Sequence, residues 1–179
     1  RVSAQSYEQM WKQVEALEQK QLPESAIKEL QKIYEHAKQE KNMPQMMKAH
    51  LTKASLSIDI TPDSLDHELS GLKIWVAEEK DPVYKAILNN LLGYYTLDTG
   101  KRDEAAIDAA IAYFRLSLQD KDILSRKSAA DYRPMTVSKE LSGKYCGDNM
   151  YQLLARQAIS RLSGYFIVNP VLAEKIQTE

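Results

Sequence analysis

The side chains that could do chemistry in this chain are three histidines, one cysteine and several carboxylates. His36, His50 and His67 are the three histidines, and none is spaced with another ligand in a known metal-binding motif. His67-Glu68 begins the zinc-protease motif H-E-x-x-H, but Gly71 stands where the second histidine belongs. We interpret all three histidines as solvated surface residues, and we predict no metal and no cofactor.

Cys146 could be a nucleophile if a histidine and an orienting group met it in the fold. Its surroundings, K-Y-C-G at residues 144–147, match no nucleophile motif, which favours an inert thiol. No hydrolase elbow and no glycine-rich phosphate loop occurs. We therefore predict a protein that is not an enzyme. A small enzyme, with Cys146 or a carboxylate pair converging in a pocket, is the least favoured alternative.

Ten tyrosines are an unusual number for a chain of 179 residues. Those in helical stripes we interpret as core residues: Tyr84, Tyr94, Tyr95 and Tyr113. The alternative is an aromatic ledge that grips a peptide in the groove of a helical solenoid. Candidates for protein contact lie in or beside an irregular segment expected at the surface, and they are Tyr132, Arg133, Tyr145 and Tyr151.

The elements that must position these side chains are marked by prolines. Pro23, Pro44, Pro62 and Pro82 stand 21, 18 and 20 residues apart, with residues in helical order between them. Proline fits the first turn of a helix and disrupts its interior. Each proline therefore predicts a helix start, and two such helices make a hairpin of about 40 residues, the size of a helical repeat.

Hydrophobic periodicity and caps give the expected boundaries. The first helix covers 6–20, and others start at Pro23, at Pro44 and after Thr61 as N-cap. A nearly all-apolar helix, expected to be central, starts after Asp81 and stops at Gly100. Asp103 caps a sixth helix, ending near Leu118. Residues 120–148 are expected to be irregular, followed by a helix over 149–163 and a short one from Asn169-Pro170.

Residues 89–117 carry a partial tetratricopeptide pattern. Leu92-Gly93 and the small residues Ala105, Ala109 and Ala112 have the required spacings, and small residues let two helices approach closely. We predict an all-α fold of stacked helical hairpins, a tetratricopeptide-like solenoid with a long irregular segment before the last helices. It forms one domain over 1–179, with hairpins over 6–119, the irregular segment over 120–148 and C-terminal helices over 149–179.

Composition limits the classes of partner. The net charge is −1, so no basic field argues for nucleic acid, and no apolar run is long enough to span a membrane. The single cysteine rules out a disulfide within the chain, which suits the cytosol and also a bacterial exported protein. The start V-S-A-Q after Arg1 resembles a signal-peptide cleavage region, although a cloned boundary explains it equally. The helical pattern at the C-terminus suggests that the natural polypeptide continues.

Four segments together resemble large bacterial alpha-2-macroglobulin-like proteins. They are S-Y-E-Q-M-W-K-Q-V-E at 6–15, L-P-E-S-A at 22–26, D-Y-R-P at 131–134 and Y-Q-L-L-A-R-Q-A-I at 151–159. The resemblance covers most of the chain. It implies the N-terminal helical region of a larger exported, envelope-associated protein that traps or inhibits proteases. The family's reactive thioester follows a C-x-E-Q motif, which Cys146 lacks, so no functional residue is carried over.

The resemblance favours a non-catalytic interaction or scaffold domain in the periplasm or cell envelope. Its expected partners are other domains of the same polypeptide or another envelope protein, not nucleic acid. The alternative is a free-standing, cytoplasmic tetratricopeptide-type adaptor that binds peptides. The ligand, the target protease and the oligomeric state stay open.

Overall fold

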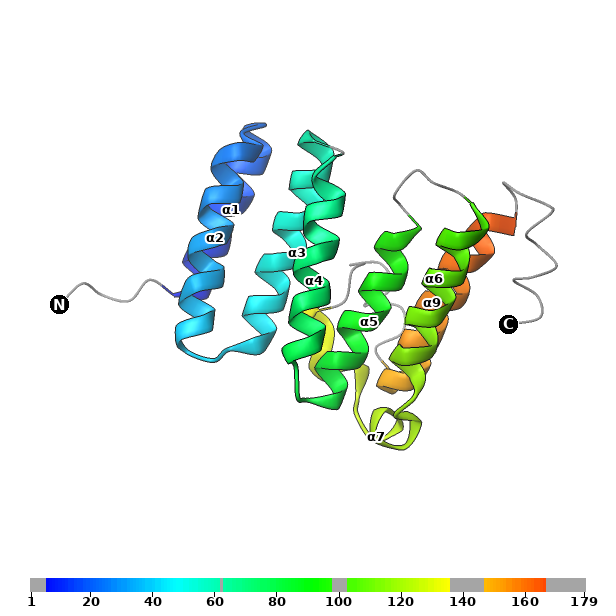
Figure 1. Cartoon of the computed structure of the whole chain (residues 1–179). Coiled ribbons are helices and arrows are strands. Elements are labelled where there is room, and N and C mark those ends of the chain that lie inside the picture. The colour runs from blue at the N-terminus through cyan, green and yellow to red at the C-terminus, as the bar shows by residue number, and fades with distance from the viewer. Residues whose placement is uncertain (1–5, 62, 98–102, 136–146, 167–179) are drawn as a thin grey trace. The chain divides into compact units, whose positions relative to one another are not determined.

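The computed structural model describes residues 6–61, 63–97, 103–135 and 147–166. Within these ranges every regular element is a helix, apart from one isolated β-bridge between Ser128 and Asn149, so the predicted all-α fold is confirmed. The chain divides into two compact units, Arg1–Ser64 and Leu65–Glu179, here called the N-terminal and the C-terminal unit (Figure 1). Whether they form one folding domain, as predicted, stays a prediction.

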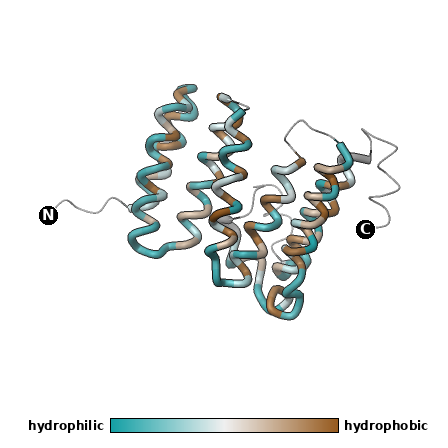
Figure 2. Tube along the Cα trace, in the orientation of Figure 1, coloured by the Kyte–Doolittle hydropathy of each residue, from teal (hydrophilic) through white to brown (hydrophobic). Residues whose placement is uncertain are grey.

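The N-terminal unit consists of α1 (Tyr7–Gln19), α2 (Pro23–Gln39) and α3 (Met43–Ile60), with α2 packed against both neighbours. Along α2 hydrophobic residues recur between hydrophilic ones, as an amphipathic helix requires (Figure 2). The buried core residues come from all three helices: Val14, Ala26, Leu30, Ile33 and Ala49. Pro23 occupies the first turn of α2, as its position in the sequence predicts.

Two turns of the same construction join these helices. Gln21 and Lys41 both have φ near 56°, in the left-handed region that residues other than glycine rarely adopt. In both turns the next amide closes the helix end: Leu22 N–H donates to the Leu17 carbonyl, and Asn42 N–H donates to the Ala37 carbonyl. These are the hydrogen bonds of a Schellman motif. The same turn therefore joins α1 to α2 and α2 to α3.

The C-terminal unit contains α5 (Pro82–Thr96), α6 (Glu104–Leu118), α7 (Lys121–Ser125), the 3₁₀ helix η1 (Ala129–Met135) and α9 (Met150–Phe166). α4 (Ser64–Glu78) precedes them and buries Leu65, Leu69 and Leu72. α5 packs against α6, α7 and α9, which agrees with its nearly all-apolar sequence. The Asp81 carboxylate accepts hydrogen bonds from the Val83 and Tyr84 amides, and this confirms the predicted cap of α5.

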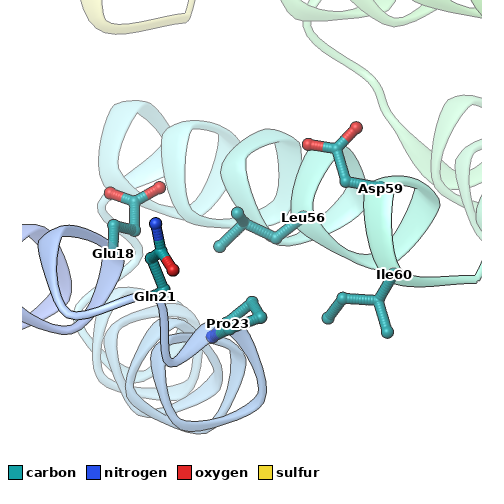
Figure 3. A pocket seen from close by; sticks show the side chains of 6 residues that line it. All are labelled: Glu18, Gln21, Pro23, Leu56, Asp59 and Ile60. Carbon is teal, nitrogen blue, oxygen red and sulfur yellow. The ribbon is translucent and has the colours of Figure 1, made fainter.

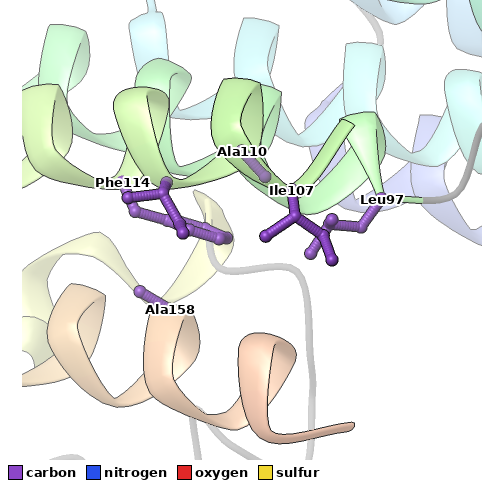
Figure 4. Close-up of a cluster of buried hydrophobic side chains, with 6 residues drawn as sticks. Leu97, Ile107, Ala110, Phe114 and Ala158 are labelled. Carbon is purple, nitrogen blue, oxygen red and sulfur yellow. The ribbon is translucent and has the colours of Figure 1, made fainter. Parts of the chain in front are cut away.

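α5 and α6 approach each other closely at Gly93. A Cβ atom there would lie 2.7 Å from a ring carbon of Phe114. Phe114 belongs to a cluster of buried residues that joins α6 to Ala158 of α9 (Figure 4). The prediction that Gly93 allows close helix packing is therefore confirmed.

A buried polar network joins the same three helices. The Asn90 side-chain amide donates to the Ser117 hydroxyl at 3.2 Å and to the Leu154 carbonyl at 3.1 Å. Ser117 in turn donates to the Phe114 carbonyl at 2.7 Å. Because a buried amide without partners would be costly, these bonds fix the register of α5, α6 and α9.

The contact face that the tetratricopeptide spacing predicts for α6 is wrong, and the buried face is the one given by its hydrophobic periodicity. Ala105 and Ala112, expected where two helices touch, are exposed, whereas Ile107, Ala110 and Phe114 are buried. The large apolar side chains lie on the opposite face of the helix, and burying them stabilises the fold more than close packing of the small residues would. The tetratricopeptide-like solenoid therefore stays a prediction, while the packed helical hairpins are observed.

Three predicted boundaries also differ. Thr61 caps the end of α3 in an extended conformation, as expected for a residue before proline, and α4 begins only at Ser64. α5 ends at Thr96, whose hydroxyl donates to the Leu92 carbonyl, and the predicted cap Gly100 lies outside the described residues. Within 120–148, α7 and η1 are ordered helices. The proposed last helix from Asn169 lies outside the described residues.

Candidate functional site

A pocket of about 330 Å³ lies at one end of the N-terminal unit, where the chain leaves α1, enters α2 and ends α3 (Figure 3). We call it the acidic pocket. Six residues line it, contributed by all three helices and the first turn: Glu18, Gln21, Pro23, Leu56, Asp59 and Ile60. The left-handed turn at Gln21 brings α2 back beside α1, and Pro23 then forms part of the wall.

The wall of the acidic pocket is apolar and its rim carries two carboxylates. Leu56 packs partly against the core of the unit, while 41% of Ile60 is exposed. Figure 3 shows the carboxylates of Glu18 and Asp59 flanking Leu56. Both acidic side chains are exposed, and no lysine, arginine or histidine is among the lining residues. This combination accepts apolar groups and attracts positive charge.

Two helix ends add to the negative potential at the pocket. α1 and α3 both end here, and the C-terminus of a helix carries the negative end of its dipole. Neither helix has a basic residue in its last turn, although Lys20 stands at the C-cap of α1 and offsets part of this charge. The N-terminus of α2 lies among them and adds a smaller positive potential, since Pro23 contributes no N–H group.

At the opposite end of the unit, polar bonds hold α1 in place. The Tyr7 hydroxyl donates to the Glu40 carboxylate at 2.6 Å, and His36 lies 3.4 Å from the other oxygen of Glu40. Partial burial and this hydrogen bond raise the pKa of Tyr7 to about 12. The Trp11 indole donates to Gln45 at 2.7 Å. These contacts fix α1 against α2 and α3, and with it the position of Glu18.

His50 does not fit the interpretation of a solvated histidine. It lies half-buried on α3, with its ring 6.1 Å from that of Tyr34. Burial, with a smaller contribution from the positive charge of Lys53, lowers the pKa of His50 to about 4. The imidazole is therefore neutral at pH 7 and belongs to the packing of the unit. His67, in contrast, is exposed as predicted.

The predicted contact residues lie in the C-terminal unit. The Tyr132 ring meets the Tyr84 ring edge-on at 6.0 Å, and burial raises the pKa of both hydroxyls. Tyr151 lies beneath Lys121, whose Nζ is 5.3 Å from the ring centre. Tyr132 and Tyr151 are each partly buried. The side chain of Arg133 and the whole of Tyr145, like Cys146, lie outside the described residues.

Sequence inspection missed the acidic pocket because its residues are spread over residues 18–60 and match no motif. In the sequence, Pro23 indicates the start of a helix and not the wall of a pocket. The available signal was a carboxylate beside apolar residues near the ends of two predicted helices, a pattern common in solvated helices.

Within the described ranges, no three or more His, Cys, Asp or Glu side chains are grouped so that they could hold a metal ion. Among the same residues, no helix is long and apolar enough to cross a membrane. Against known proteins, no family model, no curated protein and no solved structure matches this chain.

Proposed function

We propose that this chain is a non-catalytic interaction and scaffold domain that binds a segment of another polypeptide at the acidic pocket. The observation that carries the proposal is the pocket itself, a concave site with an apolar wall and a few polar groups at its rim. Such sites are where proteins bind ligands, and the polar groups at the rim set the orientation of what is bound. Bonds at the opposite end of the unit hold the helices that form it.

A peptide array probed with the labelled full chain tests this function. We expect a subset of peptides to bind the wild type and to lose binding when Ile60→Ser removes part of the apolar wall. The matched control is Ile74→Ser, because Ile74 is 61% exposed on α4 and lies outside the pocket. An array without binding, or equal loss in both variants, contradicts the proposal.

The more specific proposal rests on the resemblance in segments 6–15, 22–26, 131–134 and 151–159. It places the domain in an exported alpha-2-macroglobulin-like protein that traps proteases, where it docks against other domains or another envelope protein. The alternative is a free-standing tetratricopeptide-type adaptor, which the helical hairpins favour. Both use the same kind of peptide-binding surface, so they differ in the size and the location of the native protein.

An antibody against this region, used on fractionated cells, separates the two. A species far above 20.4 kDa, the mass of this chain, in the envelope fraction agrees with the macroglobulin-like proposal. A species near that mass in the cytosol rejects it and leaves the free-standing adaptor.

A further inference from the structure

We infer that the acidic pocket binds a lysine or arginine side chain presented by a peptide, with aliphatic neighbours beside it. The inference rests on the proposed function and names the chemistry of the segment that is bound. Three observations carry it: the apolar wall, the two rim carboxylates and the two helix C-termini that meet there.

The apolar wall fits the stem of such a side chain. Lysine and arginine bury their methylene groups along apolar surface while the charged head stays near water or a counter-charge. Pro23, Leu56 and Ile60 offer that surface. Leu22, next to Pro23, is 47% exposed and extends apolar surface along the chain beside the pocket, where a neighbouring aliphatic residue of the peptide can pack.

The negative charge at the rim suits the positively charged end of the lysine or arginine side chain. Glu18 and Asp59 are exposed acidic residues that flank the wall, and the lining contains no basic side chain to neutralise them. The C-terminal ends of α1 and α3 favour a cation in the same place. A peptide carboxylate or phosphate would face two carboxylates and two helix C-termini, opposed by Lys20 at the C-cap of α1 and by the N-terminus of α2. The balance of charge at the rim therefore favours a basic segment.

A set of three labelled peptides tests the inference on the full chain. Each has one central residue between leucines: lysine, norleucine, which keeps a similar stem without the charge, or glutamate. By fluorescence anisotropy at low salt, we expect the lysine peptide to bind about five- to tenfold more tightly than the norleucine peptide. The glutamate peptide binds most weakly, and the advantage of lysine shrinks at 0.5 M salt because exposed charges are screened.

Charge-removing variants locate the effect. Glu18→Gln and Asp59→Asn each weaken binding of the lysine peptide about two- to fivefold, as for exposed ion pairs, and the double variant removes most of its advantage over norleucine. Glu15→Gln is the matched control, because Glu15 is an exposed carboxylate of α1 that does not line the pocket. It changes the affinity less than twofold.

The outcomes separate the inference from the proposed function. Equal binding of the lysine and norleucine peptides, lost in Ile60→Ser, overturns the inference and leaves peptide binding intact. Unchanged binding in the Glu18→Gln/Asp59→Asn variant overturns it too. If none of the three peptides binds a chain shown by circular dichroism to be folded, and the peptide array is also empty, both fail.

Discussion

At Gly93 the packing of α5 against α6 depends on the absence of a side chain. A methyl group there would overlap the Phe114 ring, with the nearest ring carbon 2.7 Å away. Gly93→Ala should therefore lower the free energy of unfolding of the C-terminal unit by about 1 to 3 kcal/mol, although alanine favours helix. Chemical denaturation followed by circular dichroism measures the change.

Gly71 of α4 supplies the matched control, because a Cβ atom there meets nothing within 4 Å. Gly71→Ala should stabilise the protein by about 0.5 to 1 kcal/mol, as expected for an open helical position. Adding Phe114→Leu to Gly93→Ala should recover part of the loss. Equal effects of the two glycine substitutions would show that Gly93 is not a point of close contact.

His50 makes the stability of the N-terminal unit depend on pH. Its pKa is about 4 in the folded chain and near 6.5 when unfolded, so below pH 6.5 the unfolded chain binds a proton that the folded chain does not. The free energy of unfolding is therefore highest above pH 6.5, and it decreases as the pH falls toward 4. The loss amounts to about 1 to 3 kcal/mol.

Urea denaturation at pH 7 and pH 4.5 tests this, with Trp11 fluorescence reporting on the N-terminal unit in a Trp75→Phe background. His50→Gln should reduce the difference between the two pH values, since it removes the titrating group. His67→Gln, at an exposed histidine, should leave the difference as it is. An unaltered pH difference in His50→Gln would mean that other groups produce it.

At the scale of elements, α6 shows how one helix selects its buried face. Ala110 is fully buried, whereas Ala105 is exposed. Ala110→Trp should destabilise the C-terminal unit by about 3 kcal/mol or more, and Ala105→Trp should change stability by less than about 0.5 kcal/mol. Thermal melts decide between the two faces. A large loss for Ala105→Trp and a small one for Ala110→Trp would restore the tetratricopeptide register.

The paired turns of the N-terminal unit store backbone strain. Lys41 is not glycine but has φ near 56°, and replacing it with glycine relieves the strain. Glycine also adds entropy to the unfolded chain, so the net gain in the free energy of unfolding for Lys41→Gly should be about 0.5 kcal/mol. Lys38→Gly, at an exposed position in the last turn of α2, should instead lower it by about 0.5 to 1 kcal/mol. If both variants lose stability alike in urea titrations, the turn is unstrained.

Local signals predicted most of the elements. Pro23, Asp81 and Asp103 fix helix starts through bonds or steric limits within a few residues, and the sequence contains all that is needed. The prediction for Thr61 was wrong because an N-cap and a residue before proline both have an extended backbone. In the structure Thr61 lies at the end of α3 and not at the start of α4. α7 is five residues long, too short for any periodicity to show.

At the scale of the whole molecule, contacts between residues far apart in the sequence determine the burial of some side chains and where a pocket forms, and the sequence alone did not predict these. Half-burial of His50 follows from how α2 and α3 meet, and the contact between Tyr84 and Tyr132 joins residues 48 positions apart. The acidic pocket is a further case, because its lining residues come together only once three helices have packed. Periodicity identifies a buried face, but it does not identify which helix ends will share a pocket.

The measurement that tests the central claim most directly maps a bound peptide on the full chain by ¹H–¹⁵N NMR. Titration with the lysine-centred peptide should shift the amide signals of residues 18–22 and 56–60, with Pro23 between them giving no amide signal. Signals of α5 and α9 should stay in place. Shifts centred on Tyr84 and Tyr132, or no shifts at saturating peptide, would contradict the assignment of peptide binding to the acidic pocket.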